Sequence, residues 1–282
     1  MVGVVVVVEV GVEVEVVVGV EVVVEVGVVV VVEVGVVGEV GVGVEVEVKV
    51  VVVKNTKEPN IKIVGNFYII DGKRYVRMTR AMKTAPTFWL EQWIAKVGVE
   101  KAKEYAEATA ELGTLIHLAT ELYDLKERKR LVELVRGHDW LTPYVIGWGV
   151  YVDTYIDEIM WIERVVWSDE LRAGGRIDRL VRFKRATSAS ILDIKSTETL
   201  HDDMGVQVCG YKKMAKDTII REGLDKALIP QRTVIAHLPG PRQTPEGVER
   251  IIFDKVKVKE YDAEKYEERM MECVSDFWYL TE

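Results

Sequence analysis

The chain has 282 residues, of which 49% are hydrophobic and 30% charged, and its formal net charge is −8. Its first 53 residues hold nine Glu and one Lys, so subtracting them from the totals of 46 acidic and 38 basic residues leaves 37 of each. Residues 54–282 are therefore neutral, which excludes nucleic-acid binding through net charge and leaves only binding through a local basic surface. The two cysteines exclude a disulfide scaffold and agree with a reducing compartment.

The first 53 residues form a low-complexity segment of Val, Gly and Glu. Glycine recurs every eight residues from Gly3 to Gly43, and every even position is Val except Gly38. This alternation predicts a two-faced β structure that would bury its valine face by self-association. The alternative is a segment produced by a simple DNA repeat or a misplaced start codon. A membrane span is not expected, because each Glu would cost about 2.5 to 3.5 kcal/mol in a bilayer centre.

Residues 54–282 are long enough for one α/β domain with a well-buried core. Asp71-Gly72 is a strong hairpin signal and predicts a turn between strands at about 61–70 and 74–78. Apolar periodicity predicts the remaining elements. Helices are expected at about 86–96, 100–126, 129–136, 143–158, 203–221 and 263–280. Strands are expected at about 160–167, 171–182, 190–195, 232–237 and 249–253.

Two neighbouring strands carry the residues with the clearest chemistry. Asp178 lies on the run before the loop 184–189, and Asp193 and Lys195 lie on the run after it. Successive side chains on a strand alternate faces, so Asp193 and Lys195 share one face, and a hairpin brings Asp178 to Asp193. Two adjacent carboxylates favour a hard divalent cation such as Mg²⁺ or Mn²⁺ between them. The alternative for an isolated D-x-K is a surface ion pair on an edge strand.

Three further features lie where the same chemistry would need them. His117, at the end of the motif GTLIH, is either a contact to the metal or its water, or the partner of Glu121 one turn on. Gln207 and Tyr211 are four residues apart and share a helix face, from which they reach the substrate or the lysine, or form an ordinary amphipathic helix. Glu163 faces the site from the adjacent strand or is solvated.

In chain order these features read GTxxH, an upstream Glu, GxxD, DxK and QxxxY, and together they resemble the RecB-like branch of the PD-(D/E)XK nuclease superfamily. The runs YVRMT and WLEQWIAK, which start at Tyr75 and Trp89, are similar to the opening segment of stand-alone, phage-type members. The resemblance covers most of residues 61–215. It implies an α/β fold with a restriction-endonuclease-like core, in which helices flank a mixed central sheet, preceded by the low-complexity segment 1–53.

The resemblance also implies a role for each matching residue. The implied metal ligands are His117, Asp178, Asp193 and the Ile194 carbonyl, and the implied catalytic set is Lys195, Asp178, Asp193, Gln207 and Tyr211. In this scheme Lys195 activates water, while Gln207 and Tyr211 help hold the substrate. The orientation of Glu163 stays open, because an irregular stretch separates it from GxxD.

The implied reaction is hydrolysis of a phosphodiester in DNA, with Mg²⁺ as the cofactor and Mn²⁺ as a substitute. We expect an exonuclease in recombination, repair or viral genome processing; the alternatives are a structure-specific endonuclease and a non-catalytic nuclease-like domain. A G-x-x-x-x-G-K-[ST] loop is absent from this chain, so a helicase or recombination partner would be a separate protein. We expect the cytoplasm, or the host cytoplasm for a viral protein, and no membrane partner. The pattern favours no particular oligomeric state.

Other polar and aromatic residues have two interpretations each. Arg176, Arg182 and Lys184 share strand parity with Asp178 and predict a basic row beside the site, or else a solvated, charged strand edge. Four tryptophans have two interpretations: they pack in the core, as we expect, or they stack on bases. They are Trp89, Trp93, Trp140 and Trp148. The cysteines are expected to be buried thiols and are too few for a four-cysteine iron–sulfur cluster.

Overall fold

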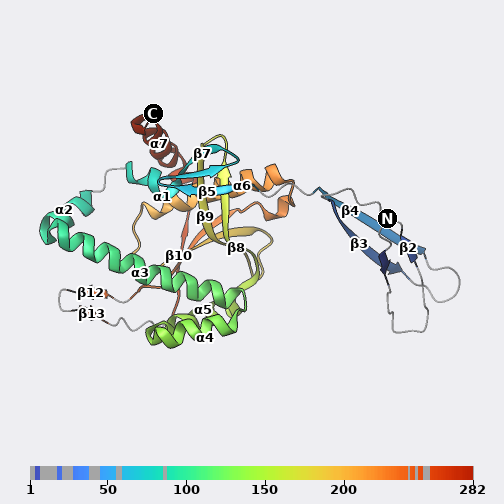
Figure 1. The fold of residues 1–282 in the computed structure, drawn as a ribbon, viewed down its shortest axis with the longest axis horizontal. Helices are drawn as coiled ribbons and strands as arrows, with labels where there is room; N and C mark the ends of the chain where they lie inside the picture. The colour runs from blue at the N-terminus through green and yellow to red at the C-terminus, as the bar shows by residue number, and fades with distance from the viewer. Residues whose placement is uncertain are drawn as a thin grey trace. The chain divides into compact units, whose positions relative to one another are not determined.

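The computed structural model describes residues 4–6, 18–20, 28–37, 45–54, 59–84, 88–240, 242–244, 247–249 and 255–281. The chain divides into two units, Met1–Pro59 and Asn60–Glu282, whose elements are labelled in Figure 1. In the first unit, β1 (Val4–Val6) pairs antiparallel with β2 (Val18–Val20), and β3 (Val28–Val37) pairs antiparallel with β4 (Glu45–Lys54). The β3–β4 register sets valine opposite valine at Val30 and Val52 and again at Val36 and Val46.

The second unit is built on an eight-stranded mixed sheet. The spatial order is β14, β11, β10, β9, β7, β6, β5, and β8 pairs with β9 off this path. The bounds are β5 (Ile61–Val64), β6 (Phe67–Ile70), β7 (Lys73–Arg77), β8 (Ile156–Ser168), β9 (Ala173–Phe183), β10 (Ala189–Lys195), β11 (Arg232–His237) and β14 (Lys257–Tyr261). A separate antiparallel pair is formed by β12 (Arg242–Thr244) and β13 (Gly247–Glu249).

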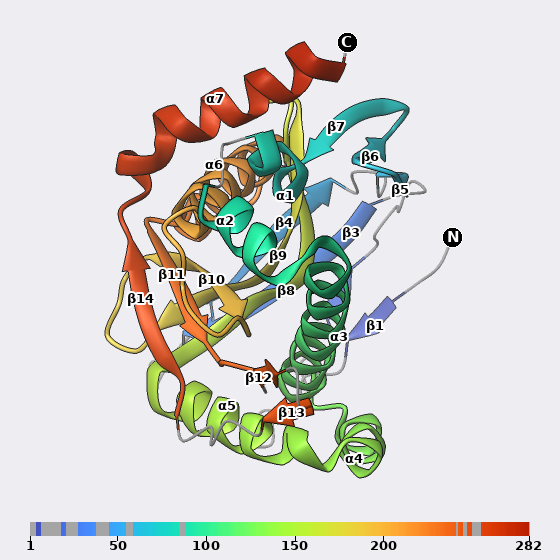
Figure 2. The same cartoon turned by 90° about the vertical axis from the view of Figure 1, so that its left-hand side faces the viewer.

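Helices cover both faces of this sheet, as Figure 2 shows. Their bounds are α1 (Met78–Ala81), α2 (Phe88–Val97), α3 (Val99–Asp124), α4 (Arg128–Gly137), α5 (Thr142–Tyr155), α6 (Met204–Glu222) and α7 (Ala263–Thr281), with short 3₁₀ turns at Met82–Thr84, Asp139–Leu141 and Lys226–Leu228. Ile191 of β10 packs in the core beneath α6 and α7, whereas Leu192 and Ile194 pack in the core beneath α3 and α5. The predicted alternation of faces along this strand is therefore confirmed, as is a mixed sheet flanked by helices.

The edge of β9 that faces away from β8 changes partner along its length. Near its start, Ala173 and Gly174 pair parallel with β7, and further along Arg179 to Arg182 pair antiparallel with β10. Within these described strands, residues 175–178 pair with neither β7 nor β10. The sheet thus forks at this point, and the fork leaves the backbone and side chain of Asp178 open to other partners.

Several predicted boundaries need correction. The strand expected at 61–70 is two strands, because Gly65 adopts a left-handed φ of 56° and turns the chain after Val64. The helix expected at 143–158 ends at Tyr155, and the β-branched Ile156 begins β8 instead. The strand expected at 249–253 lies almost entirely outside the described residues. The Asp71-Gly72 turn is confirmed, with φ of 49° and 83°.

Among the described residues, no helix combines the length and the apolar composition that crossing a bilayer requires.

The central strand generates a stability prediction. Leu192 is fully buried between β10 and the helices α3 and α5, so Leu192→Ala should lower the free energy of unfolding by about 2–5 kcal/mol in urea denaturation. The control is Val64→Ala, at a valine that is 58% exposed on β5, which should change it by less than about 0.5 kcal/mol. Equal effects of the two substitutions would contradict this placement of the core.

Candidate metal centre

Asp178 lies at the fork and joins three elements. Its Oδ2 accepts a hydrogen bond from the backbone amide of Ile194 at 2.6 Å, and its Oδ1 lies 3.6 Å from Nδ1 of His117 on α3. The ladder between β9 and β10 stops at the pair of Leu192 and Arg179, so the next inward amide of β10 uses this carboxylate in place of a backbone carbonyl. The predicted hairpin therefore brings Asp178 to β10, and α3 brings His117 to Asp178.

Glu163 completes the group from β8. Its neighbours Ile162 and Arg164 pair with Arg179 and Ile177, so Glu163 stands opposite Asp178. Its φ is 49°, a left-handed value that is uncommon for a non-glycine residue and is found mainly where a side chain serves a specific purpose. The sequence does not fix the orientation of Glu163; in the structure its side chain points to the site.

One ligand atom each from His117, Glu163 and Asp178 lies within 4.8 Å of the other two. The two carboxylate oxygens suit Mg²⁺ or Mn²⁺, and the imidazole nitrogen suits a divalent ion of the first transition row. Burial raises the pKa of Glu163 and Asp178 raises it further, against the opposing effect of nearby arginines. A cation between the two carboxylates would remove this repulsion.

Asp193, the other predicted metal ligand, is bound differently. Its side chain is buried and pairs with Lys195, with 2.5 Å between Nζ and Oδ2, and it lies outside the group of three. Burial raises the pKa of Asp193 to about 6, and Asp178 adds to this while Lys195 opposes it. Burial alone would lower the pKa of Lys195, but Asp193 and Asp178 raise it overall, so its ammonium group keeps its proton. For Ile194, the structure shows an amide contact to Asp178; metal binding by its carbonyl stays a prediction.

Gln207 and Tyr211 meet on α6, as their spacing predicts. Nε2 of Gln207 donates a hydrogen bond to the Tyr211 hydroxyl at 2.7 Å, and both residues are buried. The Tyr211 ring lies on Gly175, where an added Cβ would come within 2.4 Å of Cε1 of the ring. Burial raises the pKa of Tyr211, and Asp193 contributes, so the phenol stays neutral beside the acidic residues.

A buried arginine behind the group was not predicted. Arg179 is fully buried; its Nε donates to Oδ2 of Asp124 at 2.6 Å and its Nη1 donates to the Asp178 carbonyl at 2.7 Å. Nη1 also lies 3.3 Å from Oε1 of Glu163. Asp124 in turn accepts a hydrogen bond from Trp148 Nε1 at 2.9 Å. The arginine therefore holds both acidic residues of the candidate centre from behind.

One sequence signal could have suggested this arrangement. Asp124 follows His117 by seven residues, so both occupy one face of α3.

The predicted basic row is largely occupied by neighbouring groups. Arg182 pairs with Glu158 at 2.8 Å, and Lys184 donates to the carbonyl of Asp153 at 2.5 Å. Arg176 pairs with Glu163 at 3.0 Å and lines the site cavity. Arg182 lies on a strand inside the sheet, with β8 on one side and β10 on the other, so the alternative of a charged strand edge is wrong for it; Arg176 belongs to the site.

The tryptophans and cysteines take different places. Trp148 is fully buried in the core, as expected, whereas Trp93 lines the cavity beside the acidic group. The side chain of Trp89 lies outside the described residues. Both cysteines are free and buried, as predicted.

The acidic group opens into a cavity of about 1020 Å³. Its walls include one face of α3, the end of β7 at Arg77, and the segment from Ser196 to Thr199 that follows β10. Its volume is that of a pocket for a drug-sized ligand.

Comparison with models of protein families gave no match, and a search of curated proteins found none that is similar.

The buried arginine generates a second stability prediction. Asp124→Ala removes the nearest counter-charge of the buried Arg179 guanidinium, leaving Glu163 at 3.3 Å, and should lower the free energy of unfolding by about 3–5 kcal/mol. Removing Glu127, which pairs with Arg130 on the surface, should cost less than about 1 kcal/mol and serves as the control. Both are measured by urea denaturation, and a loss for Asp124→Ala no greater than that of the control would contradict the assigned network.

Proposed function

We propose that the protein is a metal-dependent nuclease of the PD-(D/E)XK kind that hydrolyses phosphodiester bonds in DNA as an exonuclease. The observation that supports it is the meeting of motif residues from five segments, α3, β8, β9, β10 and α6, around Asp178. No single motif carries the proposal, because each has an ordinary structural explanation on its own.

Mg²⁺ is the proposed cofactor, with Mn²⁺ as a substitute, and His117, Glu163 and Asp178 are the residues that would hold it. Their donor atoms fit a hard divalent ion, and the raised pKa of Glu163 reflects burial and repulsion that such an ion would offset. When bound, the ion supplies a Lewis acid that withdraws charge from the phosphoryl oxygens.

The remaining residues position the phosphate and water. Lys195 keeps its proton because Asp193 and Asp178 raise its pKa, so it offers a fixed positive charge and orients water as a donor. Arg176 adds a second positive charge at the cavity wall, 3.0 Å from Glu163. The Gln207–Tyr211 pair fixes α6 against β9 beneath these groups.

Action from a DNA end, a role in recombination, repair or viral genome processing, and a separate helicase or recombination partner come from the family resemblance. A structure-specific endonuclease and a non-catalytic DNA-binding domain are the competing functions, and the substrate experiment below separates them.

Metal binding is tested by calorimetric titration of the full chain with Mn²⁺. Asp178→Asn and Glu163→Gln should each weaken binding by at least about tenfold, because each removes a charged ligand. Glu158→Gln changes a carboxylate on the same strand that pairs with Arg182 outside the centre, and it should bind Mn²⁺ as the wild type does. Unchanged binding in all three variants would rule out this centre.

Activity is tested on end-labelled linear DNA and closed circular DNA, single- and double-stranded, with Mg²⁺ or EDTA. We expect Mg²⁺-dependent loss of linear DNA alone, reduced by about 10²–10⁴-fold in Asp178→Asn and Lys195→Met. Lys213→Met, at a surface lysine of α6 paired with Glu170, is the matched control and should keep full activity.

Each other outcome has a distinct meaning. Cutting of circular DNA would replace the exonuclease by the endonuclease. Binding of DNA without cleavage of any substrate would favour the non-catalytic domain, and a fully active Lys195→Met variant would refute the assigned role of the lysine.

A further inference from the structure

The cavity extends well beyond the acidic group along α3. It reaches Trp93 on α2 and Tyr105 near the start of α3, whereas His117 lies three helical turns further along. Tyr105, Thr109, Gly113 and His117 follow one another at four-residue intervals and therefore share one face of the helix. At 1.5 Å per residue, the twelve residues from Tyr105 to His117 span about 18 Å.

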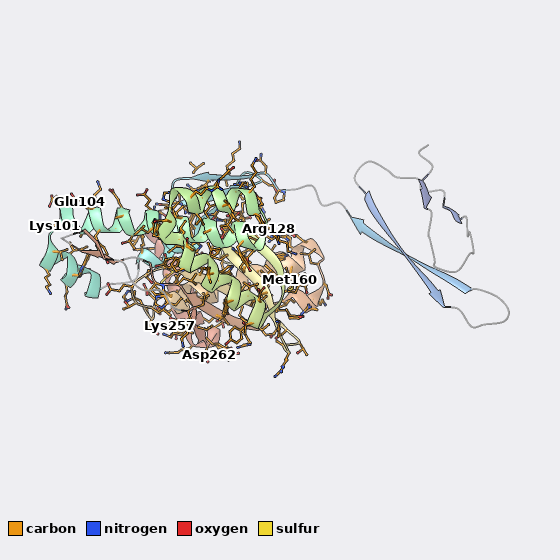
Figure 3. The ribbon with its side chains drawn as sticks, turned by 90° about the horizontal axis from the view of Figure 1, so that it is seen from below. Lys101, Glu104, Arg128, Met160, Lys257 and Asp262 are labelled. Carbon is orange, nitrogen blue, oxygen red and sulfur yellow. The ribbon has the colours of Figure 1, made fainter. Side chains whose placement is uncertain are left out.

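Figure 3 shows how far this helix runs across the unit. Lys101 and Glu104, in its first turns, are labelled at one end of the second unit, and Arg128, just beyond the helix, is labelled well away from them. Since Tyr105 directly follows Glu104, the aromatic end of the cavity lies toward that end of the unit.

Trp93 and Tyr105 form an aromatic pair at the far end. Their ring centroids are 5.5 Å apart with an interplanar angle of 61°. Both side chains are half-buried, both line the cavity, and neither belongs to a hydrophobic core cluster of the described residues. Packing in a core therefore does not account for this pair, and its exposed part faces the same space as the acidic group.

The residues between the two ends leave room for an extended ligand. On α3 they are small, namely Ala106, Thr109, Ala110 and Gly113, so the helix leaves room between the aromatic pair and His117. Two arginines, Arg77 and Arg176, line the cavity and can pair with phosphates, and four carboxylates line it as well, namely Glu121, Glu163, Asp178 and Glu198. A volume of about 1020 Å³ accommodates a short unpaired segment, whereas a duplex is far larger.

We infer that this extension binds a single-stranded segment of the DNA substrate, with an unpaired base stacked on Trp93 and Tyr105 while a phosphate several nucleotides away lies at His117, Glu163 and Asp178. This inference rests on the proposed nuclease function and specifies its substrate at the site. Aromatic rings that are open to a groove bind single strands regardless of sequence, because every base has a face that can stack. The site would therefore require a frayed or single-stranded end.

The experiment measures binding without hydrolysis. Full-length Asp178→Asn protein in EDTA is titrated with a fluorescein-labelled thymidine oligonucleotide of about eight nucleotides, a length within the range of single-strand sites, and with a labelled dinucleotide. Adding Trp93→Ala or Tyr105→Ala should weaken binding of the longer oligonucleotide by roughly 5- to 100-fold. The dinucleotide is too short to reach both ends of the cavity and should bind the Asp178→Asn protein more weakly than the longer oligonucleotide does. Trp93→Phe retains a stacking ring and should restore most of the affinity.

Trp140→Ala is the matched control. Trp140 is also half-buried and packs edge-on against Tyr144, but it does not line the cavity. It should bind both oligonucleotides with unchanged affinity, and thermal melting of each variant checks that folding is retained. If Trp93→Ala has a lowered melting temperature, the stacking site is tested by comparing the oligonucleotide affinities of Trp93→Phe and Tyr105→Ala.

The outcomes separate this inference from the proposed function. Unchanged affinity of both Trp93→Ala and Tyr105→Ala for the longer oligonucleotide would overturn the stacking site and leave the nuclease proposal standing. If Trp93→Ala weakened binding of a blunt duplex as much as binding of the longer oligonucleotide, the single-strand assignment would be overturned. Absence of binding to any oligonucleotide, together with absence of Mg²⁺-dependent cleavage by the wild type, would overturn the proposed function itself.

Discussion

The candidate centre is organised by one hydrogen bond at the fork of the sheet, from the amide of Ile194 to the carboxylate of Asp178. Where β9 passes from β7 to β10, backbone pairing stops and a buried amide would otherwise lose its partner, at a cost of about 1–3 kcal/mol. Asp178 satisfies that amide with one oxygen and keeps the other directed at His117. A gap in the ladder and a metal-binding carboxylate are thus the same structural feature.

The buried guanidinium of Arg179 offsets the negative charge of the acidic residues around this hydrogen bond. Burial penalises the charged forms of Asp124 and Glu163 and raises the pKa of each, and the guanidinium of Arg179 opposes both shifts. Because Arg179 also donates to the carbonyl of Asp178, a single buried cation fixes the backbone and side chains of two elements. A buried ion pair adds little net stability, so we interpret its contribution as the selection of one arrangement of the acidic groups.

Local sequence patterns predicted much of the arrangement. Contacts between distant residues, and residues with irregular backbone geometry, could not be predicted in this way. The β9–β10 hairpin and the Gln207–Tyr211 pair follow from a short loop and from helical spacing, and both are confirmed. The pairing of Arg179 with Asp124 joins residues 55 apart, so the helical spacing of His117 and Asp124 indicates the face of Asp124 but not its partner. Glu163 departs from regular strand geometry through its left-handed φ, so strand alternation could not orient it. Asp193 pairs with Lys195 because residues two apart on a strand share a face.

The glycines of two motifs have a consequence for how this sequence can change. A Cβ at Gly175 would collide with the Tyr211 ring, and a Cβ at Gly113 would lie 2.8 Å from Oγ of Ser196, the residue after Lys195. Each glycine is therefore the steric complement of a side chain in or beside another motif. Segments that look like independent signatures along the chain are matched surfaces in space, so a larger residue at Gly175 requires a smaller one at Tyr211.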